Sequence, residues 1–218
     1  MGIYIPGAMG SFTGKIGNVV LTKWKKTLVG KSVQVKSKKS PTDAQIIHRL
    51  KFGLISHFVN INRPAIKIGY QSAKKKITPV NAALKYHFDK VITGIPPDYQ
   101  IDYSKVKLTL PYSVNEIGNG LDVSTVMLEG QHVKVHWTQS PRPNYLTMYS
   151  DLAYLVFYNP ERNQSFFVRK GARRDALEIT VQLPGRFSKQ QIYGYLFFVS
   201  ANGKLVSATH YLGEWLIE

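Results

Sequence analysis

The chain has 218 residues, of which 29 are Lys or Arg and 13 are Asp or Glu, so its formal net charge is +16. Hydrophobic residues make up 44% and aromatic residues 12%, which is enough to bury a core and excludes wholesale disorder. Cysteine is absent, which excludes disulfide frameworks, thiolate metal sites and thiol catalysis.

The positive charge is concentrated in the N-terminal half. Residues 1–110 hold 19 Lys or Arg against 4 Asp or Glu, whereas residues 111–218 hold 10 against 9. Such asymmetry indicates two parts with different partners, so we predict two domains, 1–110 and 111–218. The first would attract polyanions, although a merely solvated lysine-rich surface is the alternative.

A β-hairpin is expected near the N-terminus. The first 17 residues hold five glycines and are expected to be irregular. Apolar and polar side chains then alternate over residues 16–24 and 27–35, as in paired strands. Lysines gather around Trp24. Lysines beside an exposed ring suit a surface that follows a nucleic-acid backbone, whereas a buried Trp24 with solvated lysines is the alternative.

Two amphipathic helices follow, each begun by a cap and a proline. Ser40-Pro41-Thr42-Asp43 starts the first, whose apolar residues keep helical spacing to about Asn60. A short helical piece is expected over residues 64–70. Thr78-Pro79 starts the second helix, and Gly94 suits its C-terminal end.

Basic side chains from the hairpin and the helical region form the predicted binding surface. Phosphate contacts would dominate such binding, so it would be sensitive to salt and independent of base sequence. The candidate residues for nucleic acid or another anion are Lys23, Lys25, Lys26, Lys31, Lys36, Lys38, Lys39, Arg49, Lys51, Lys74, Lys75 and Lys76.

The rest of the chain predicts strands. A loop over residues 95–103 and a half-buried strand over 106–110 lead into the C-terminal half. Short apolar segments separated by turns then predict seven strands of an antiparallel β-sandwich. The segments are 121–127, 131–137, 152–158, 164–170, 176–182, 191–199 and 204–211.

Several short motifs in these strands carry a resemblance. They are Val133-x-Val135-x-Trp137, Tyr154, Leu183-Pro184-Gly185, Tyr193-x-Tyr195 and Val199-x-Ala201-Asn202-Gly203. Through them the C-terminal half resembles a fibronectin type III-like or immunoglobulin-like domain. The resemblance implies that Trp137 and Tyr193 are structural, and the longer link containing Pro141-Arg142-Pro143 departs from it. The predicted fold class is α+β, with a basic N-terminal unit of one β-hairpin and two amphipathic helices, followed by an all-β immunoglobulin-like sandwich.

A second resemblance covers most of residues 1–110. It rests on Ser11-Phe12-Thr13-Gly14-Lys15-Ile16-Gly17-Asn18-Val19-Val20, Trp24, Pro41-Thr42-x-Ala44-Gln45-x-x-x-Arg49-x-Lys51-Phe52 and Ile101-Asp102-Tyr103-Ser104-Lys105. These residues are similar to a family of uncharacterised proteins of about this length from Bacteroidetes bacteria and their mobile elements. The resemblance implies no chemistry, and it points toward virion components.

The residues that could carry catalysis do not form a recognisable site. His132 and His136 share a strand face, but four residues of strand separate them by roughly 13 Å, too far to chelate one metal. His48 and His57 lie nine residues apart on one helix and hence on opposite sides. We therefore expect no enzyme, no cofactor and no metal, although a triad assembled across the fold stays open.

Three functions remain in competition. The first is a structural or assembly protein, such as a phage-type virion component, whose partners would be copies of itself or other structural subunits. The second is a sequence-independent nucleic-acid-binding protein. The third is a cell-surface adhesion or carbohydrate-binding module with Tyr145, Tyr149 and Tyr158 as candidate platforms. No apolar run reaches the 18 residues of a membrane span and the N-terminus lacks signal-peptide features, so we expect a cytoplasmic or virion location.

Overall fold

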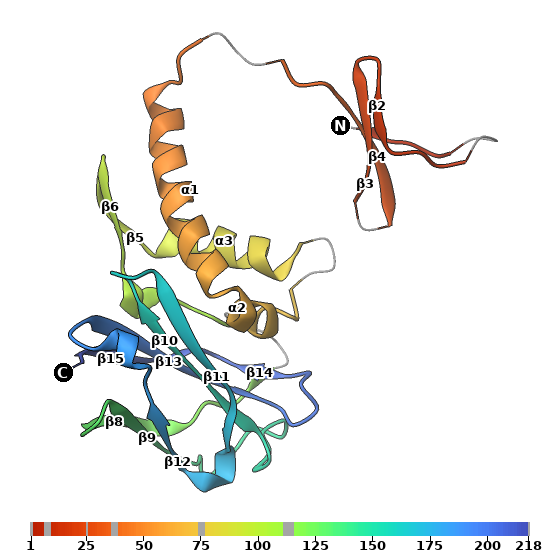
Figure 1. Ribbon diagram of the computed structural model, residues 1–218. Coiled ribbons are helices and arrows are strands. Elements are labelled where there is room, and N and C mark those ends of the chain that lie inside the picture. The colour runs from red at the N-terminus through yellow and green to blue at the C-terminus, as the bar shows by residue number, and fades with distance from the viewer. Residues whose placement is uncertain are drawn as a thin grey trace. The chain divides into compact units, whose positions relative to one another are not determined.

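The computed structural model describes residues 2–6, 10–24, 26–35, 39–73, 77–110 and 116–217. The chain divides into two compact units, Met1–Thr42 and Asp43–Glu218 (Figure 1). We call them the N-terminal unit and the main unit. The expected boundary after residue 110 falls inside the main unit.

The N-terminal unit is an antiparallel sheet of four strands in the order β1-β4-β3-β2. The strands are β1 (Gly2–Ile3), β2 (Gly14–Ile16), β3 (Val19–Trp24) and β4 (Thr27–Ser32). The expected hairpin is β3 and β4, and the glycine-rich segment adds the two outer strands. Gly17, with φ +55°, provides the left-handed conformation of the tight turn between β2 and β3.

Three α-helices open the main unit. They are α1 (Asp43–Ile61), α2 (Arg63–Gly69) and α3 (Pro79–Lys90). The Thr78 side chain accepts a hydrogen bond from the Asn81 N–H, and Pro79 occupies the first turn of α3. None of the described helices combines the length and the apolar content that a membrane span requires.

The strands of the main unit form two sheets and a hairpin. The larger sheet has the order β11-β10-β13-β14-β7, with β15 also paired to β13, and the smaller sheet has the order β12-β9-β8. The hairpin strands are β5 (Ile92–Ile95) and β6 (Asp98–Ile101). The sheet strands are β7 (Glu116–Ile117), β8 (Leu121–Leu128), β9 (His132–Thr138), β10 (Leu152–Asn159), β11 (Gln164–Arg173), β12 (Glu178–Gln182), β13 (Gln191–Val199), β14 (Val206–Ser207) and β15 (His210–Leu216).

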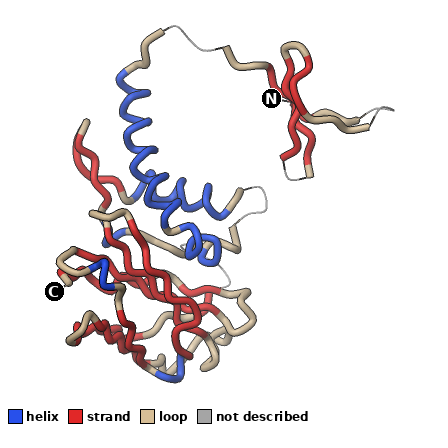
Figure 2. Tube along the Cα trace, viewed as in Figure 1, coloured by secondary structure: helices blue, strands red, loops and turns tan. Residues whose placement is uncertain are grey.

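Strand β10 is buried on both of its faces. Tyr154 and Val156 pack in a core with residues of the helices, among them Phe58. Leu155 and Phe157 pack in a second core with residues of the smaller sheet. The main unit therefore has three layers, in which the larger sheet lies between the helices and the smaller sheet (Figures 1 and 2).

The predicted fold class is wrong in its central feature. The C-terminal strands do not form a separate all-β immunoglobulin-like domain, because one face of their larger sheet shares a core with α1, α2 and α3. The fold is mixed and rich in strands. Strands β10 and β13 are apolar along almost their whole length, which is typical of strands covered on both faces. Trp137 is nevertheless a core residue, buried between the two sheets.

Two connecting segments also differ from expectation. Residues 95–103, expected as a loop, contribute to the β5–β6 hairpin. Residues 106–110 form no strand; instead Val106 and Leu108 are buried, and the Leu110 N–H donates to the Gly69 carbonyl at 3.0 Å. The Thr109 N–H donates to Thr209 Oγ1 at 2.9 Å, so this segment is tied to the chain near β15.

Candidate functional site

The predicted basic residues do not all belong to one body. Lys25, Lys36, Lys38, Lys74, Lys75 and Lys76 lie outside the described residues. Lys23, Lys26, Lys31 and Lys39 belong to the N-terminal unit, whereas Arg49 and Lys51 lie on α1 of the main unit. Lys51 is half-buried, and its Nζ lies 4.8 Å from the centre of the Tyr99 ring on β6.

The register of the N-terminal sheet sorts its side chains onto two faces. Residues directly opposite each other on antiparallel strands share a face. Ile16 pairs with Val19 and Lys23 with Leu28, and alternation puts Leu21 with them. We call this set the apolar face. Its only cation among the described residues is Lys23.

The opposite side of the same sheet carries more charge. Lys15 and Lys31 both pair with Val20, one from each neighbouring strand. Trp24, half exposed at the end of β3, lies on this side too. We call this side the basic face; besides Lys15, Val20, Trp24 and Lys31, it holds the exposed Ile3 and the buried Val29, which pair with each other. The first 42 residues hold eight lysines and no Asp or Glu.

The N-terminal unit has almost no interior. Among its described residues only Val29, 6% exposed, is buried. Ile16 and Val19 on the apolar face are 54% and 44% exposed. Two of the apolar side chains that alternation would place in a core are therefore open, while Leu21 and Leu28 are half-buried.

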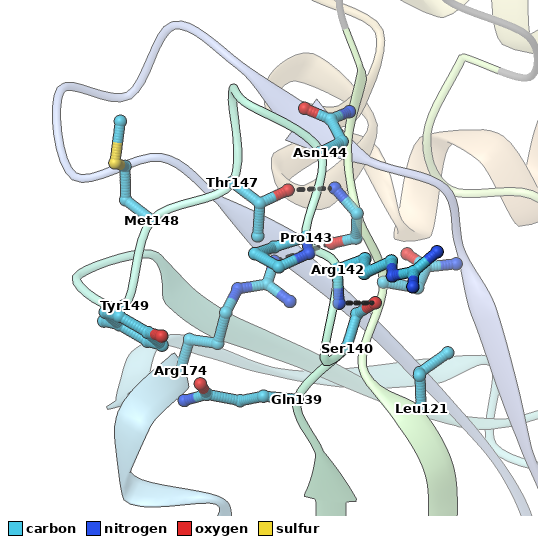
Figure 3. Close-up of a pocket in the computed structure, with 12 residues that line it drawn as sticks. Leu121, Gln139, Ser140, Arg142, Pro143, Asn144, Thr147, Met148, Tyr149 and Arg174 are labelled. Atoms are coloured by element: carbon cyan, nitrogen blue, oxygen red, sulfur yellow. Dashed lines mark hydrogen bonds between the residues drawn. The ribbon is translucent and has the colours of Figure 1, made fainter.

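A cavity of about 340 Å³ lies in the main unit, where the link from β9 to β10 meets the start of β8 and the end of β11 (Figure 3). We call it the Arg174 pocket. It is lined by Gly118, Asn119, Leu121, Gln139, Ser140, Arg142, Pro143, Asn144, Thr147, Met148, Tyr149 and Arg174.

Arg174 is fixed in place by several contacts. It is 3% exposed, its Nε donates to Asp151 Oδ2 at 3.2 Å, and its Nη2 donates to the Gly118 carbonyl at 2.6 Å. Its guanidinium carbon lies 3.9 Å from the centre of the Phe198 ring. Burial lowers the pKa of Arg174, and the adjacent Asp151 opposes that shift.

Three polar side chains in the lining hold the pocket wall together. Thr147 Oγ1 accepts from the Gly118 N–H at 2.7 Å, and Asn144 Nδ2 donates to the Glu116 carbonyl at 2.7 Å. Ser140 Oγ accepts from the Arg142 N–H at 3.2 Å. These three side chains therefore stabilise the wall of the pocket through hydrogen bonds to the backbone.

Other polar groups of the lining make no hydrogen bond within the described part of the chain. Asn119 Oδ1 is buried and has no partner there. The side chains of Gln139 and Arg142 and the Nη1 of Arg174 likewise have none. Tyr149, one of the expected aromatic platforms, is 63% exposed at the pocket, whereas Tyr158 is buried in the helical core.

The side chains that line the Arg174 pocket are suited to binding a ligand through hydrogen bonds and charge. Over the described residues, no group of three or more His, Asp or Glu side chains could hold a metal ion. The pocket lining contains no acidic residue. Sequence reasoning missed this pocket, because its free polar groups come from three separate segments of the chain and form no recognisable motif.

A family model described as a family of unknown function (DUF6266) matches residues 11–213. The match confirms the expected resemblance at the level of an uncharacterised family. It extends beyond residues 1–110 through most of the main unit. No curated protein matches the chain.

Proposed function

The chain belongs to this family of unknown function, and we propose that it is a non-enzymatic assembly subunit that associates through its N-terminal sheet. One observation carries the proposal: the apolar face of that sheet is open, and Val29 is the only buried side chain among the unit's described residues.

The open sheet has a physical reason to find a partner. A sheet gains stability by covering one face with another layer. Burying an exposed Val, Leu or Ile side chain contributes about 1.5–3 kcal/mol. Ile16 and Val19 are the exposed side chains of the apolar face, and together with the remaining exposed area of the half-buried Leu21 and Leu28 they would contribute a few kcal/mol on association.

The expected occupant of the apolar face is the same face of a second copy. Two identical faces related by a twofold axis are self-complementary, and stacked sheets pack with their side chains interleaved. Lys23, the only described cation there, sits at the end of β3 beside the turn. The more strongly charged side, with Lys15 and Lys31, would then face outward.

A matched pair of lysine substitutions tests the proposal. We expect the full-length protein to show concentration-dependent self-association by light scattering after size exclusion. Val19→Lys places a charge on the apolar face and should weaken association by about ten-fold or more. Thr22→Lys adds the same charge to the same strand on the opposite side and should leave association unchanged. A strictly monomeric wild type at every concentration, or equal effects of the two substitutions, would contradict the proposal.

A phage-type virion is the setting that the resemblance to proteins of mobile elements favours. Association through two identical faces closes as a twofold dimer, so a virion particle would need a further, heterologous contact between such dimers, which builds rings or fibres. Negative-stain microscopy of the concentrated protein should then show particles of regular shape. Amorphous material alone would count against a virion role.

Binding of nucleic acid is the second candidate, and the basic face favours it. Lys15 and Lys31 flank one position of the sheet, and Trp24 lies on the same side. Lysines beside an exposed ring combine phosphate contacts with base stacking. This binding would be compatible with assembly through the opposite side.

Charge reversal on the basic face tests this second candidate. Fluorescence anisotropy with a labelled single-stranded oligonucleotide should show binding that weakens as salt rises. The double substitution Lys15→Glu/Lys31→Glu should reduce affinity by about ten-fold or more. Lys85→Glu/Lys90→Glu on α3 makes the same change in net charge and is the control. Equal losses in both double variants would indicate a general effect of net charge and would contradict a site on the basic face.

A further inference from the structure

The Arg174 pocket contains polar groups without hydrogen-bond partners among the described residues, and their chemistry indicates which class of ligand the pocket would bind. Arg142 is an exposed cation of the lining, and the Nη1 of Arg174 adds N–H donors held in fixed positions. Asn119 Oδ1 is a buried acceptor without a partner among the described residues. A buried polar atom in this state costs free energy until a donor reaches it.

The lining favours a negatively charged ligand. None of the twelve lining residues is acidic, while two are arginines. Asp151 balances part of the Arg174 charge from behind, since its Oδ2 accepts from both Arg174 Nε and the Met148 N–H. Arg142 therefore provides the main unbalanced charge. An arginine fork binds a carboxylate with two parallel hydrogen bonds.

The remaining groups favour a ligand with hydroxyls and one apolar face. The amides of Asn119 and Gln139 can each donate and accept, which suits adjacent hydroxyl groups. Tyr149 presents an exposed ring, and Figure 3 shows Tyr149, Arg174 and Gln139 close together in the view of the pocket. An aromatic ring covers the apolar side of a small ligand while polar groups fix its edge.

We propose that the Arg174 pocket binds an acidic monosaccharide unit, with its carboxylate on Arg142, its hydroxyls on Asn119, Gln139 and the free N–H donors of Arg174, and its apolar side on Tyr149. The cavity of about 340 Å³ is of the size that accepts one small ligand. The site is independent of the N-terminal sheet, so it does not rest on the assembly role. Such a site would allow the subunit to bind a polysaccharide, either free or on the surface of a cell.

Titrations of the full-length protein followed by backbone NMR test the site. D-glucuronic acid should shift amide signals of residues 118–121 and 139–149 at concentrations up to about 50 mM, a range that detects millimolar affinity. D-glucose, which lacks the carboxylate, should bind about ten-fold more weakly or not at all. Acetate, which lacks the hydroxyls, should do the same. N-acetyl-alanine carries a carboxylate beside a peptide amide and represents the end of a polypeptide.

Two substitutions locate the binding. Arg142→Ala and Gln139→Ala remove side chains without hydrogen-bond partners in the described structure, so the thermal unfolding temperature should stay unchanged. Arg142→Ala should weaken glucuronic acid binding by about ten-fold or more, and Gln139→Ala by a smaller factor. Arg169→Ala removes an exposed arginine that does not line the pocket, and it should have no effect.

Each of the other outcomes overturns the proposal. The absence of shifts with glucuronic acid excludes an acidic saccharide site. Equal binding of glucose excludes the role of the carboxylate, and equal or tighter binding of acetate or N-acetyl-alanine excludes a saccharide as the ligand class. Equal losses in Arg142→Ala and Arg169→Ala place the binding elsewhere.

Discussion

His87 is a titratable group inside the helical core of the main unit. It is fully buried on α3, its Nδ1–H donates to the Ala83 carbonyl at 2.7 Å, and its Nε2 accepts from the Lys107 N–H at 3.4 Å. These two bonds require the neutral ring with its proton on Nδ1. Burial lowers the pKa of His87 to about 4.

This lowered pKa makes the stability of the main unit sensitive to acid. Between pH 6.5 and about 4 the unfolded chain binds a proton on His87 that the folded chain does not, so stability falls as the pH falls. The loss over this window is on the order of 3 kcal/mol. Urea unfolding across the window should show this slope in the wild type and a shallower slope in His87→Gln.

A histidine on the outside of α1 provides the control for that experiment. His57→Gln removes an exposed imidazole and should keep the slope of the wild type. The lowered pKa values of His210 and Asp102 contribute in all three proteins and cancel in the comparison. Identical slopes in His87→Gln and the wild type would contradict the role of His87.

Helix α3 depends on a single side-chain cap. Thr78 Oγ1 accepts from the Asn81 N–H at 3.2 Å and satisfies one of the free donors of the first turn. Thr78→Ala should lower the free energy of unfolding of the main unit by about 1 kcal/mol. Thr78→Ser keeps the hydroxyl and should stay close to the wild type. Equal stability of all three proteins in chemical denaturation would contradict a capping role.

Local chemistry predicted only some of the helix ends: α1 begins at Asp43 and not at the expected Ser40-Pro41 cap, and Gly94 lies in β5, beyond the end of α3 at Lys90. Thr78-Pro79 is a cap followed by a proline at the first turn, and the structure starts α3 at Pro79. The strand positions were largely predictable too, because β8 to β13 fall on apolar segments between turns. Which elements pack against the two faces of a strand does not depend on the local sequence. The near-continuous apolar runs of β10 and β13 carried that signal, and reading them as two-layer strands led to the wrong fold class.

The Arg174 pocket could not be predicted from spacing. The pairing of β8, β9 and β10 with their neighbouring strands brings together the polar residues of the pocket, which are Asn119, Gln139, Arg142 and Arg174. Their order along the chain does not show that these segments meet. The departure of Pro141-Arg142-Pro143 from the immunoglobulin-like pattern was the one sequence signal near it. The lysines of the N-terminal unit could be identified from the sequence as a concentration of positive charge. Which of them share a face of the sheet could be assigned only from the strand register.

The two units differ in how much interior they possess. The main unit has one core on each side of β10, whereas the N-terminal sheet has Val29 as its only buried side chain among the described residues. Regions with few buried contacts open locally at low free-energy cost. The N-terminal sheet should therefore be the less stable part when the protein is monomeric.

Hydrogen exchange measures this difference directly. In dilute protein the amides of β3 and β4 should exchange at least about a hundred-fold faster than those of β10 and β13. Raising the protein concentration should slow exchange in β3 and β4 alone, because association covers them. Equal protection of both units in dilute protein would mean that the N-terminal sheet is stable without a partner.

The middle position of β10 and β13 also governs the order in which the chain becomes stable during synthesis. The helices leave the ribosome first, but the strands that cover them follow much later. The bond between Thr109 and Thr209 closes over 100 residues. Contacts this distant form slowly and leave apolar helix faces uncovered while translation continues. The main unit can therefore complete its fold only after β13 and β15 have been made, and until then its exposed apolar helix faces can bind chaperones.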